Sequence, residues 1–380
     1  MKELLVAIFM IGVIALLVNV SQGAPRRQPT LMPVTLLDLY RHSDAVFEAR
    51  FDRIEEGDTI KQDQDYSVVS VKKLFDVSSS LKGSYSKFIS LTEDEYRYPA
   101  PPSPQYLFTK STGGEDEQTY GLRSGDTVLL FLKYGEDGKT FQLTDDDEGL
   151  KKLSSNDMAV YEKRIRELDS LLSGEPSAPK IVEWMLLCAE DPATRWEATF
   201  ELVKGFERLD YQKRQKQSES DGVKNTIGEK PDFFDSATFA KAVTDEQKRK
   251  LADILLDRQP PQIGEDGVAK RTYVRGDREL IDLVKHWGDP RLPAFLLNEL
   301  KTKDLTDYRR SEAMQLIADL LGDPRVVGVA QKYNASYRNQ ALAEQLFDSQ
   351  GDNANPATDY KQARTALMAK FIKLASSVIE

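Results

Sequence analysis

The distribution of apolar positions divides the chain into a strand-like first part and a helix-like second part. Between Ala45 and Ile54, apolar side chains alternate with charged ones, which is the two-residue period of a half-buried strand. Beyond residue 179, apolar positions recur three and four residues apart, as on the buried side of a helix. The pattern predicts a multidomain protein of the β + α class, with the strands first.

Four further runs have the composition of strands, and a short helix over 35–42 should precede the first strand. These runs are Tyr66 to Phe75, Lys87 to Thr92, Thr127 to Tyr134 and Thr140 to Thr144. The last two are joined through Asp137-Gly138, a dipeptide typical of hairpin turns. Five antiparallel strands imply a small barrel, and a helix ending near Leu172 should complete a first domain over 35–174.

A long insertion over 93–124 separates the third and fourth strands and is rich in proline and tyrosine. Proline at this density favours an extended polyproline conformation, in which Tyr96 and Tyr98 could present a surface to a partner. The alternative is a solvated loop that covers the mouth of the barrel. The acidic run 145–148 could hold a cation, but it lacks the spacing of an EF-hand loop, which favours a solvated turn.

One phrase, Gly-Asp-Pro-Arg, occurs twice in the helical part, at 288–291 and at 322–325. We expect the glycine to end one helix in the left-handed conformation, the aspartate to cap the next helix, and the proline to be its first residue. Asp191 and Pro192 repeat the second half of the phrase. The predicted structural caps are Asp191, Asp289, Pro290, Asp323 and Pro324.

The two copies begin 34 residues apart, and an apolar stripe lies on each helical pattern between and around them. A single helix cannot bury such a stripe, so neighbouring helical hairpins must stack. A spacing of 34 residues is typical of helical-hairpin repeats. We therefore expect residues 178–380 to form an α-helical solenoid, separated from the first domain by the Ser, Gly and Pro residues at 173–179.

Two resemblances refine this architecture. The segments Ser43 to Phe47, Val69 to Gly83 and Leu122 to Leu132 resemble the OB-fold domain of the netrin-like and tissue-inhibitor-of-metalloproteinases type, in its cysteine-free bacterial form. That resemblance implies an OB-like β-barrel that binds proteins or carbohydrates. In the inhibitors an N-terminal cysteine chelates the zinc of the protease, and this chain has no cysteine there.

The Gly-Asp-Pro-Arg phrases, together with Arg-x-x-Ala at 195–198, 310–313 and 338–341, resemble HEAT repeats, in particular the short HEAT-like type of phycobilisome-lyase relatives. The resemblance implies that the arginines pair with acidic groups along each hairpin, which is a structural role. It does not bring lyase chemistry with it. The spacing also suits tetratricopeptide repeats, but their Trp, Gly and Tyr positions do not align with this sequence.

The N-terminus has the residue pattern of an export signal. Leu4 to Val18 is an unbroken apolar run after Lys2, and small residues follow it, which indicates a signal peptide over 1–23 and a proline-rich leader over 24–34. The alternative is an uncleaved anchor, which would be the protein's membrane contact. With a single cysteine in 380 residues, the exported chain suits a bacterial periplasm or cell surface better than an oxidising animal extracellular space.

Charge and composition exclude several functions. With 52 basic and 62 acidic residues the net charge is −10, so nucleic acid is not an expected partner. Cys188 lies in an apolar run and is better explained as a buried hydrophobe than as a nucleophile, and His286 as a residue at a helix end than as a base. With two histidines and one cysteine, the sequence predicts no zinc site and no cofactor.

The sequence therefore predicts an exported, non-catalytic interaction protein that binds a partner protein through a helical-repeat groove and a face of the barrel. Candidate contacts on the helical part are Arg275, Trp287, Arg309 and Arg338, because exposed arginine and tryptophan dominate protein interfaces. The alternative is an enzyme or a protease-inhibitor-like protein whose site lies between the domains and is formed by scattered acids and tyrosines.

Overall fold

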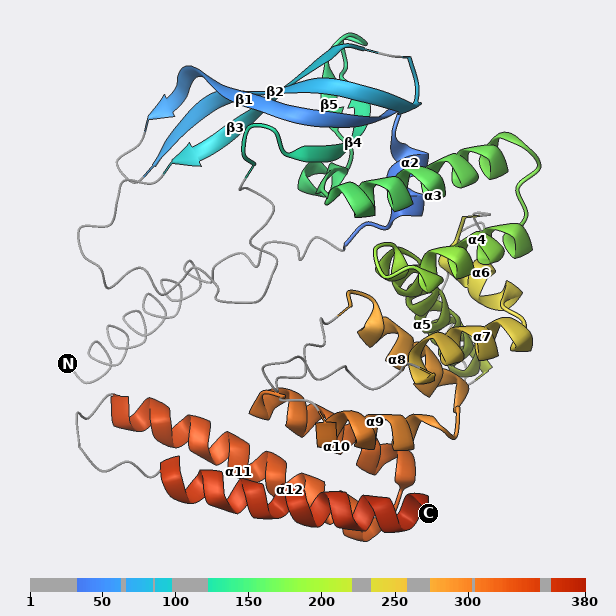
Figure 1. Ribbon diagram of the computed structural model, residues 1–380, viewed down its shortest axis with the longest axis vertical. Helices are drawn as coiled ribbons and strands as arrows, with labels where there is room; N and C mark the ends of the chain where they lie inside the picture. The colour runs from blue at the N-terminus through green and yellow to red at the C-terminus, as the bar shows by residue number, and fades with distance from the viewer. Residues whose placement is uncertain are drawn as a thin grey trace, which may run out of the picture. The chain divides into compact units, whose positions relative to one another are not determined.

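The computed structural model describes residues 33–62, 66–84, 86–97, 122–220, 234–257, 274–302, 305–348 and 357–380. Strands occupy the first part of the described chain and helices the rest, as the apolar pattern predicts (Figure 1). The predicted signal peptide, most of the leader, and most of the insertion over 93–124 lie outside the described residues.

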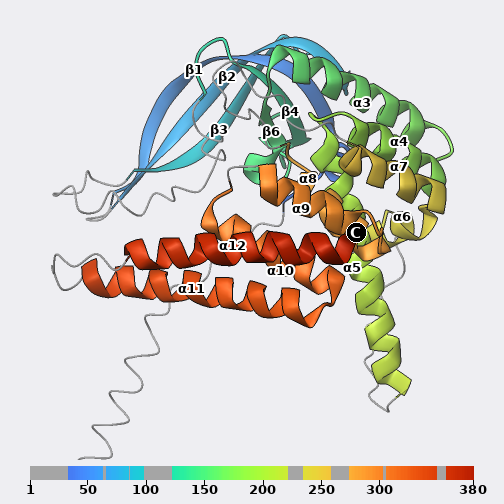
Figure 2. The ribbon, with the colours of Figure 1, turned by 60° about the horizontal axis from the view of Figure 1, so that its bottom comes forward.

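Six antiparallel strands form one sheet in the order β3-β2-β1-β4-β5, with β6 also paired to β4. The strands are β1 (Ala45–Gln62), β2 (Ser67–Lys82), β3 (Phe88–Arg97), β4 (Thr127–Tyr134), β5 (Phe141–Leu143) and β6 (Leu150–Lys152). The pairing of β1 with β2 is interrupted by several register shifts, which allow two long strands to bend. Figure 2 shows this curvature in β1, β2 and β3.

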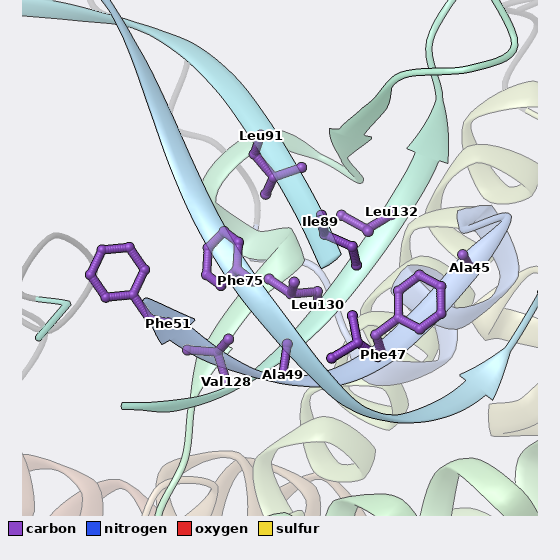
Figure 3. Close-up of a cluster of buried hydrophobic side chains, with 11 residues drawn as sticks. Ala45, Phe47, Ala49, Phe51, Phe75, Ile89, Leu91, Val128, Leu130 and Leu132 are labelled. Atoms are coloured by element: carbon purple, nitrogen blue, oxygen red, sulfur yellow. The ribbon is translucent and has the colours of Figure 1, made fainter. Parts of the chain in front are cut away.

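The buried face of the sheet holds one apolar cluster, drawn in Figure 3. Phe47 and Phe51 on β1 lie with Phe75 on β2, and the rings of Phe51 and Phe75 meet edge to face with their centroids 5.5 Å apart. The other members are Ala45, Ala49, Val77, Ile89, Leu91, Val128, Leu130 and Leu132. The alternating residues of β1 therefore face this core, as their two-residue period predicts.

The predicted closed barrel is wrong, because the sheet stays open between β3 and β5. The reason lies along the outer side of β4, where two three-residue strands share the edge instead of one continuous strand. Between them Thr144 N–H donates to Phe131 O, and Gly149 packs so closely on Thr144 that a Cβ atom would lie 2.4 Å from its carbonyl oxygen. An edge interrupted in this way offers β3 no continuous row of partners.

Two helices flank the sheet. α2 (Leu36–His42) begins after the N-cap Thr35, and α3 (Ser155–Ser173) begins after the N-cap Ser154, whose side chain accepts from Asp157 N–H. α2 agrees with the predicted range 35–42 to within one residue, and α3 ends one residue after the predicted Leu172. A short break over 174–177 separates α3 from the next helix, and Thr35–Glu380 form one compact unit. The predicted division into domains over 35–174 and 178–380 stays a prediction.

The remaining helices follow in chain order. They are α4 (Ala178–Glu190), α5 (Arg195–Ser220), α6 (Ser236–Ala242), α7 (Asp245–Leu256), α8 (Asp277–Trp287), α9 (Leu292–Thr302), α10 (Asp307–Leu321), α11 (Pro324–Asp348) and α12 (Ala357–Ile379). Successive helices from α7 to α12 pack on one another, and α12 also packs on α9 and α10. The views agree that α11 and α12 lie side by side (Figures 1 and 2).

The two Gly-Asp-Pro-Arg turns have the local geometry that the sequence predicts. Gly288 and Gly322 are the left-handed C-caps of α8 and α10, and Pro324 is the first residue of α11. The first copy differs in one respect, because α9 begins only at Leu292, two residues after Pro290. The packing into helical hairpins is present, whereas their assembly into a solenoid stays a prediction. Among the described helices, none is long and apolar enough to cross a membrane.

Candidate functional site

Two of the predicted contact residues lie at opposite ends of α8. Arg275 precedes the helix, is exposed, and places its guanidinium 3.9 Å from the centroid of the Trp196 ring. Trp287 is the last residue of the helix, is half-buried, and lies edge-on to Phe206. Both side chains therefore pack against α5, and the structure does not bring them together in one site.

The other predicted contacts are dispersed. Arg309 on α10 and Arg338 on α11 are both exposed. Tyr96 lies in β3 opposite Val68, and Tyr98 lies outside the described residues. The role of these four residues as contacts stays a prediction.

Of the predicted aspartate caps, Asp323 directly precedes α11, whereas Asp289 lies three residues before the first residue of α9. Asp289 and Asp323 each accept from the backbone N–H two residues later, at 2.9 Å from Arg291 and 2.8 Å from Arg325. The guanidinium of Arg325, together with the backbone N–H groups of Arg325 and Val326, lowers the pKa of Asp323 to about 2. Asp191 accepts from Ala193 N–H at 3.0 Å, but α5 begins only at Arg195, so Asp191 caps a turn before the helix.

A buried pair of carboxylates, Glu197 and Glu201, lies where α5 meets the start of α2. Their side chains are four residues apart on α5 and each is 1% exposed. Glu197 Oε2 accepts from Leu36 N–H at 2.7 Å, and Glu201 Oε2 accepts from the Thr35 hydroxyl at 2.9 Å. Negative charge is thereby placed at the positive end of α2, where backbone N–H groups lack partners within the helix.

The other oxygens of this pair are occupied as well. Glu197 Oε1 accepts from the Tyr161 hydroxyl at 2.7 Å and lies 3.1 Å from Lys151 Nζ. Glu201 Oε1 accepts from the Ser236 hydroxyl, and Lys204 Nζ lies 3.3 Å from Glu201 Oε2. We call Glu197, Glu201 and these partners the junction cluster. Burial and the neighbouring Glu197 raise the pKa of Tyr161 well above its ordinary value.

This arrangement is that of a structural clasp. A general acid or base must exchange a proton with a substrate, and an activated carboxylate needs a free lone pair directed at the reacting atom. All four carboxylate oxygens of the junction cluster have donors within the protein, and the groups are excluded from solvent. The cluster joins α2, β6, α3, α5 and α6 at one place.

A second group of charged residues lines an open pocket of about 320 Å³ where α10, α11 and α12 meet. Asp307, the first residue of α10, is its centre. Its carboxylate lies 3.1 Å from Arg310, 3.2 Å from Arg364 and 3.3 Å from the Tyr333 hydroxyl. We call this the α10–α12 pocket, and Lys361, Thr306, Thr365, Leu305 and Met368 complete its lining.

The charges of the α10–α12 pocket do not balance. Three cations, Arg310, Lys361 and Arg364, line it with one carboxylate, that of Asp307. Arg364 is 6% exposed, and its buried Nε has no hydrogen-bond partner among the described residues. Lys361 is exposed, and no described residue pairs with its ammonium group. The pocket therefore has a local excess of positive charge in a chain whose net charge is −10.

A smaller open pocket of about 250 Å³ lies between the end of α7 and α9. Its charged lining consists of Asp257, Glu299 and Arg291. Arg291 is already engaged, because its guanidinium lies 2.8 Å from both Asp253 and Asp289. The arginine in this pocket therefore stabilises the turn after α8 through these ion pairs and is not available to a ligand.

The residues considered for chemistry in the sequence are placed as follows. Cys188 is fully buried on α4, and burial raises the pKa of its thiol. His286 lies against the Phe206 ring and 3.5 Å from Asp210 Oδ2. In the acidic run, Asp145 lies 3.9 Å from both Lys133 and His42, and the side chains of Asp146 and Asp147 are outside the described set. Nowhere in the described chain are three His, Cys, Asp or Glu side chains grouped to hold a metal ion.

Sequence reasoning missed the central residues of both charged groups. Glu197 and Glu201 have a signal, because two acids four residues apart lie on one face of α5. Lys361 and Arg364 have a similar one, since a spacing of three residues places both on one side of α12. Neither spacing indicates which other helices or strands these side chains contact.

Comparisons with family models, curated proteins and solved structures give no match to this chain. The netrin-like and HEAT-like resemblances therefore stay predictions.

Proposed function

We propose that this protein is an exported, non-catalytic interaction protein that binds a partner protein through its C-terminal helices. The observation that carries the proposal is the α10–α12 pocket, which is open and is lined by the exposed Lys361 and the largely buried Arg364 beside a single carboxylate, that of Asp307. Unneutralised arginine and lysine at an open pocket serve recognition of a negatively charged group. A catalytic role would require, in addition, a nucleophile or a base with a free lone pair in the α10–α12 pocket.

The helical packing supports the same proposal. Each helix from α7 to α12 packs on the next one in the chain, as consecutive hairpins of a repeat array do. We infer that these hairpins form a HEAT-like solenoid, that its exposed Arg309 and Arg338 belong to the binding surface, and that the netrin-like sheet supplies a second face. α12 limits the length of any groove, because it also packs on α9 and α10.

The alternative function is an enzyme or inhibitor with a site between the strand region and the helices. It has one specific observation in its favour, because Glu197 and Glu201 do bring two carboxylates together there. Their complete set of protein donors favours the structural role instead. An Asn or Gln at either position would abolish activity in an enzyme, whereas a clasp would lose stability alone.

The test of the interaction proposal is capture from the extracellular or envelope fraction with the purified mature chain as bait. Arg338→Glu reverses an exposed charge on α11, and Lys370→Glu on α12 is the matched control away from the lining of the α10–α12 pocket. A partner that is retained by wild type and Lys370→Glu, is lost or weakened with Arg338→Glu, and binds in purified form with a measurable Kd supports the proposal. Wild-type bait that retains no protein in saturable amounts contradicts it.

Export is the remaining part of the proposal and has its own test. We infer that the apolar run after Lys2 directs export and is cleaved after Gly23 or Ala24. N-terminal sequencing of the protein from the envelope fraction should give a mature chain beginning at residue 24 or 25. A chain that keeps residues 1–23 and sediments with membranes would identify the segment as an anchor.

A further inference from the structure

The α10–α12 pocket combines space with unused hydrogen-bond donors. Arg364 is 6% exposed, and its guanidinium shares a single carboxylate, that of Asp307, with Arg310 and Tyr333. Burying a cation is costly unless its charge and its N–H groups are matched. Asp307 is the one carboxylate in the lining beside Arg364 and Lys361, and Arg364 Nε has no acceptor among the described residues.

We propose that this pocket is an oxyanion site, which takes a carboxylate or phosphate group between Arg310, Lys361 and Arg364. An oxyanion supplies several acceptor oxygens and the missing negative charge in one group. Arginine and lysine are the residues that hold such groups in proteins, arginine through its planar fork and lysine as a point charge. The site lies at the first turn of α10, whose helix dipole adds to the attraction for an anion.

The lining also indicates what the oxyanion is attached to. A volume of about 320 Å³ exceeds what a single phosphate or carboxylate group fills, and Leu305 and Met368 give part of the wall an apolar character. Mixed polar and apolar walls suit a group that carries a carbon skeleton. Resting on the proposed function, we infer that the natural occupant is a carboxylate of the partner protein, from an acidic side chain or from its C-terminus.

The test is isothermal titration calorimetry of the mature chain with sodium acetate, sodium phosphate and a short peptide with a free C-terminal carboxylate, at constant ionic strength. The informative variant is Lys361→Gln, because Lys361 is exposed and its loss should leave the fold intact. The matched control is Lys370→Gln, nine residues further along α12 and thus on its opposite side. Circular dichroism should give the same helix content for all three proteins.

We expect saturable binding of at least one oxyanion to wild type and Lys370→Gln, and binding about tenfold weaker to Lys361→Gln, which is the effect of one charge-assisted hydrogen bond. Binding of the peptide acid but not of its C-terminal amide identifies a carboxylate as the ligand, and binding of phosphate alone identifies a phosphate group. Absence of saturable binding, or equal weakening in both variants, overturns the oxyanion site.

The result for the oxyanion site can be distinguished from the result for the proposed interaction function. If the small anions do not bind but the partner is still retained and measured in purified form, the interaction function stands and the partner uses another surface. If the anions bind and no partner is found, the oxyanion site stands and its ligand is a free small molecule.

Discussion

The junction cluster and the α10–α12 pocket are built from the same residue types and differ in how completely their charges are matched. In the junction cluster, Glu197 and Glu201 are enclosed, and every carboxylate oxygen has a donor within the chain. In the α10–α12 pocket, one carboxylate faces three cations and the pocket is open to solvent. Buried charged groups whose hydrogen bonds are all made within the protein hold its elements together. Charged groups at an open surface that lack such partners are available to a ligand.

The largest expected effect comes from breaking the junction cluster. Glu197→Ala removes the acceptor of Leu36 N–H, Tyr161 and Lys151 at once, and leaves a buried lysine without its charge partner. Removing one partner of a buried charged group costs about 3 to 5 kcal/mol of unfolding free energy. Urea unfolding followed by circular dichroism measures the loss.

The control for this substitution is Glu183→Ala, on the exposed side of α4. A surface change of this kind should alter the free energy of unfolding by no more than about 0.5 kcal/mol. If Glu197→Ala lost no more than Glu183→Ala, the junction cluster would not be the clasp described here.

A smaller loss is expected from Asp307→Asn in the α10–α12 pocket. The substitution removes the carboxylate charge that pairs with Arg310 and Arg364. Because the Asp307 side chain is 36% exposed, solvent screens part of the effect, and we expect a loss of about 1 to 2 kcal/mol. Thermal unfolding with and without sodium phosphate gives the sharper result, since an anion in the pocket should replace the missing charge.

Phosphate should therefore raise the Tm of Asp307→Asn by more than it raises the Tm of wild type. Sodium chloride at the same ionic strength is the control for general screening. If phosphate raised the Tm of both proteins equally, an anion bound in the pocket would not be replacing the charge of the Asp307 carboxylate.

The sequence predicted the β region well where one face of a strand is buried. The alternation in β1 ends near Phe51, which is the last buried residue of that strand, and the predicted strand ends three residues later. The strand continues to Gln62 because its backbone pairs with β2, and both faces are exposed there, so no apolar pattern marks it. The closed barrel failed for a related reason, since the three-residue strands β5 and β6 carry too few side chains to show a period.

The helical part was predictable at its turns and not at its charged sites. Gly288 and Gly322 act locally, within a few residues of their own position. The junction cluster joins Leu36 to Glu197, 161 positions apart. Such pairings depend on how whole elements pack, which periodicity along one helix does not contain.

A pH-dependent effect is expected where the acids Glu48 and Glu162 meet, on the α3 side of the sheet. Burial, and then the charge of the neighbouring Glu162, raises the pKa of Glu48 above its ordinary value of 4.5. The folded state therefore binds a proton more tightly than the unfolded state, and stability falls as the pH rises from about 4.5 through the folded pKa. Glu48→Gln should remove this fall and be more stable than wild type at pH 7.

Urea unfolding of both proteins between pH 4 and pH 7 measures the difference. The two stabilities should converge toward pH 4, where Glu48 is protonated in wild type. A difference that stayed constant across this range would show that the charge of Glu48 is not its cause. Convergence would add a third case to the comparison, in which two neighbouring negative charges destabilise the fold instead of binding a ligand.

The smallest effect on stability is expected from Lys361→Gln, the substitution that should matter most for binding. Since no described residue pairs with this exposed ammonium group, its loss should change the free energy of unfolding by no more than about 0.5 kcal/mol. Urea unfolding in buffer without phosphate or carboxylate measures it. A loss above about 1 kcal/mol would mean that Lys361 has a partner in the folded chain, and the pocket would then resemble the junction cluster, with its charge already in use.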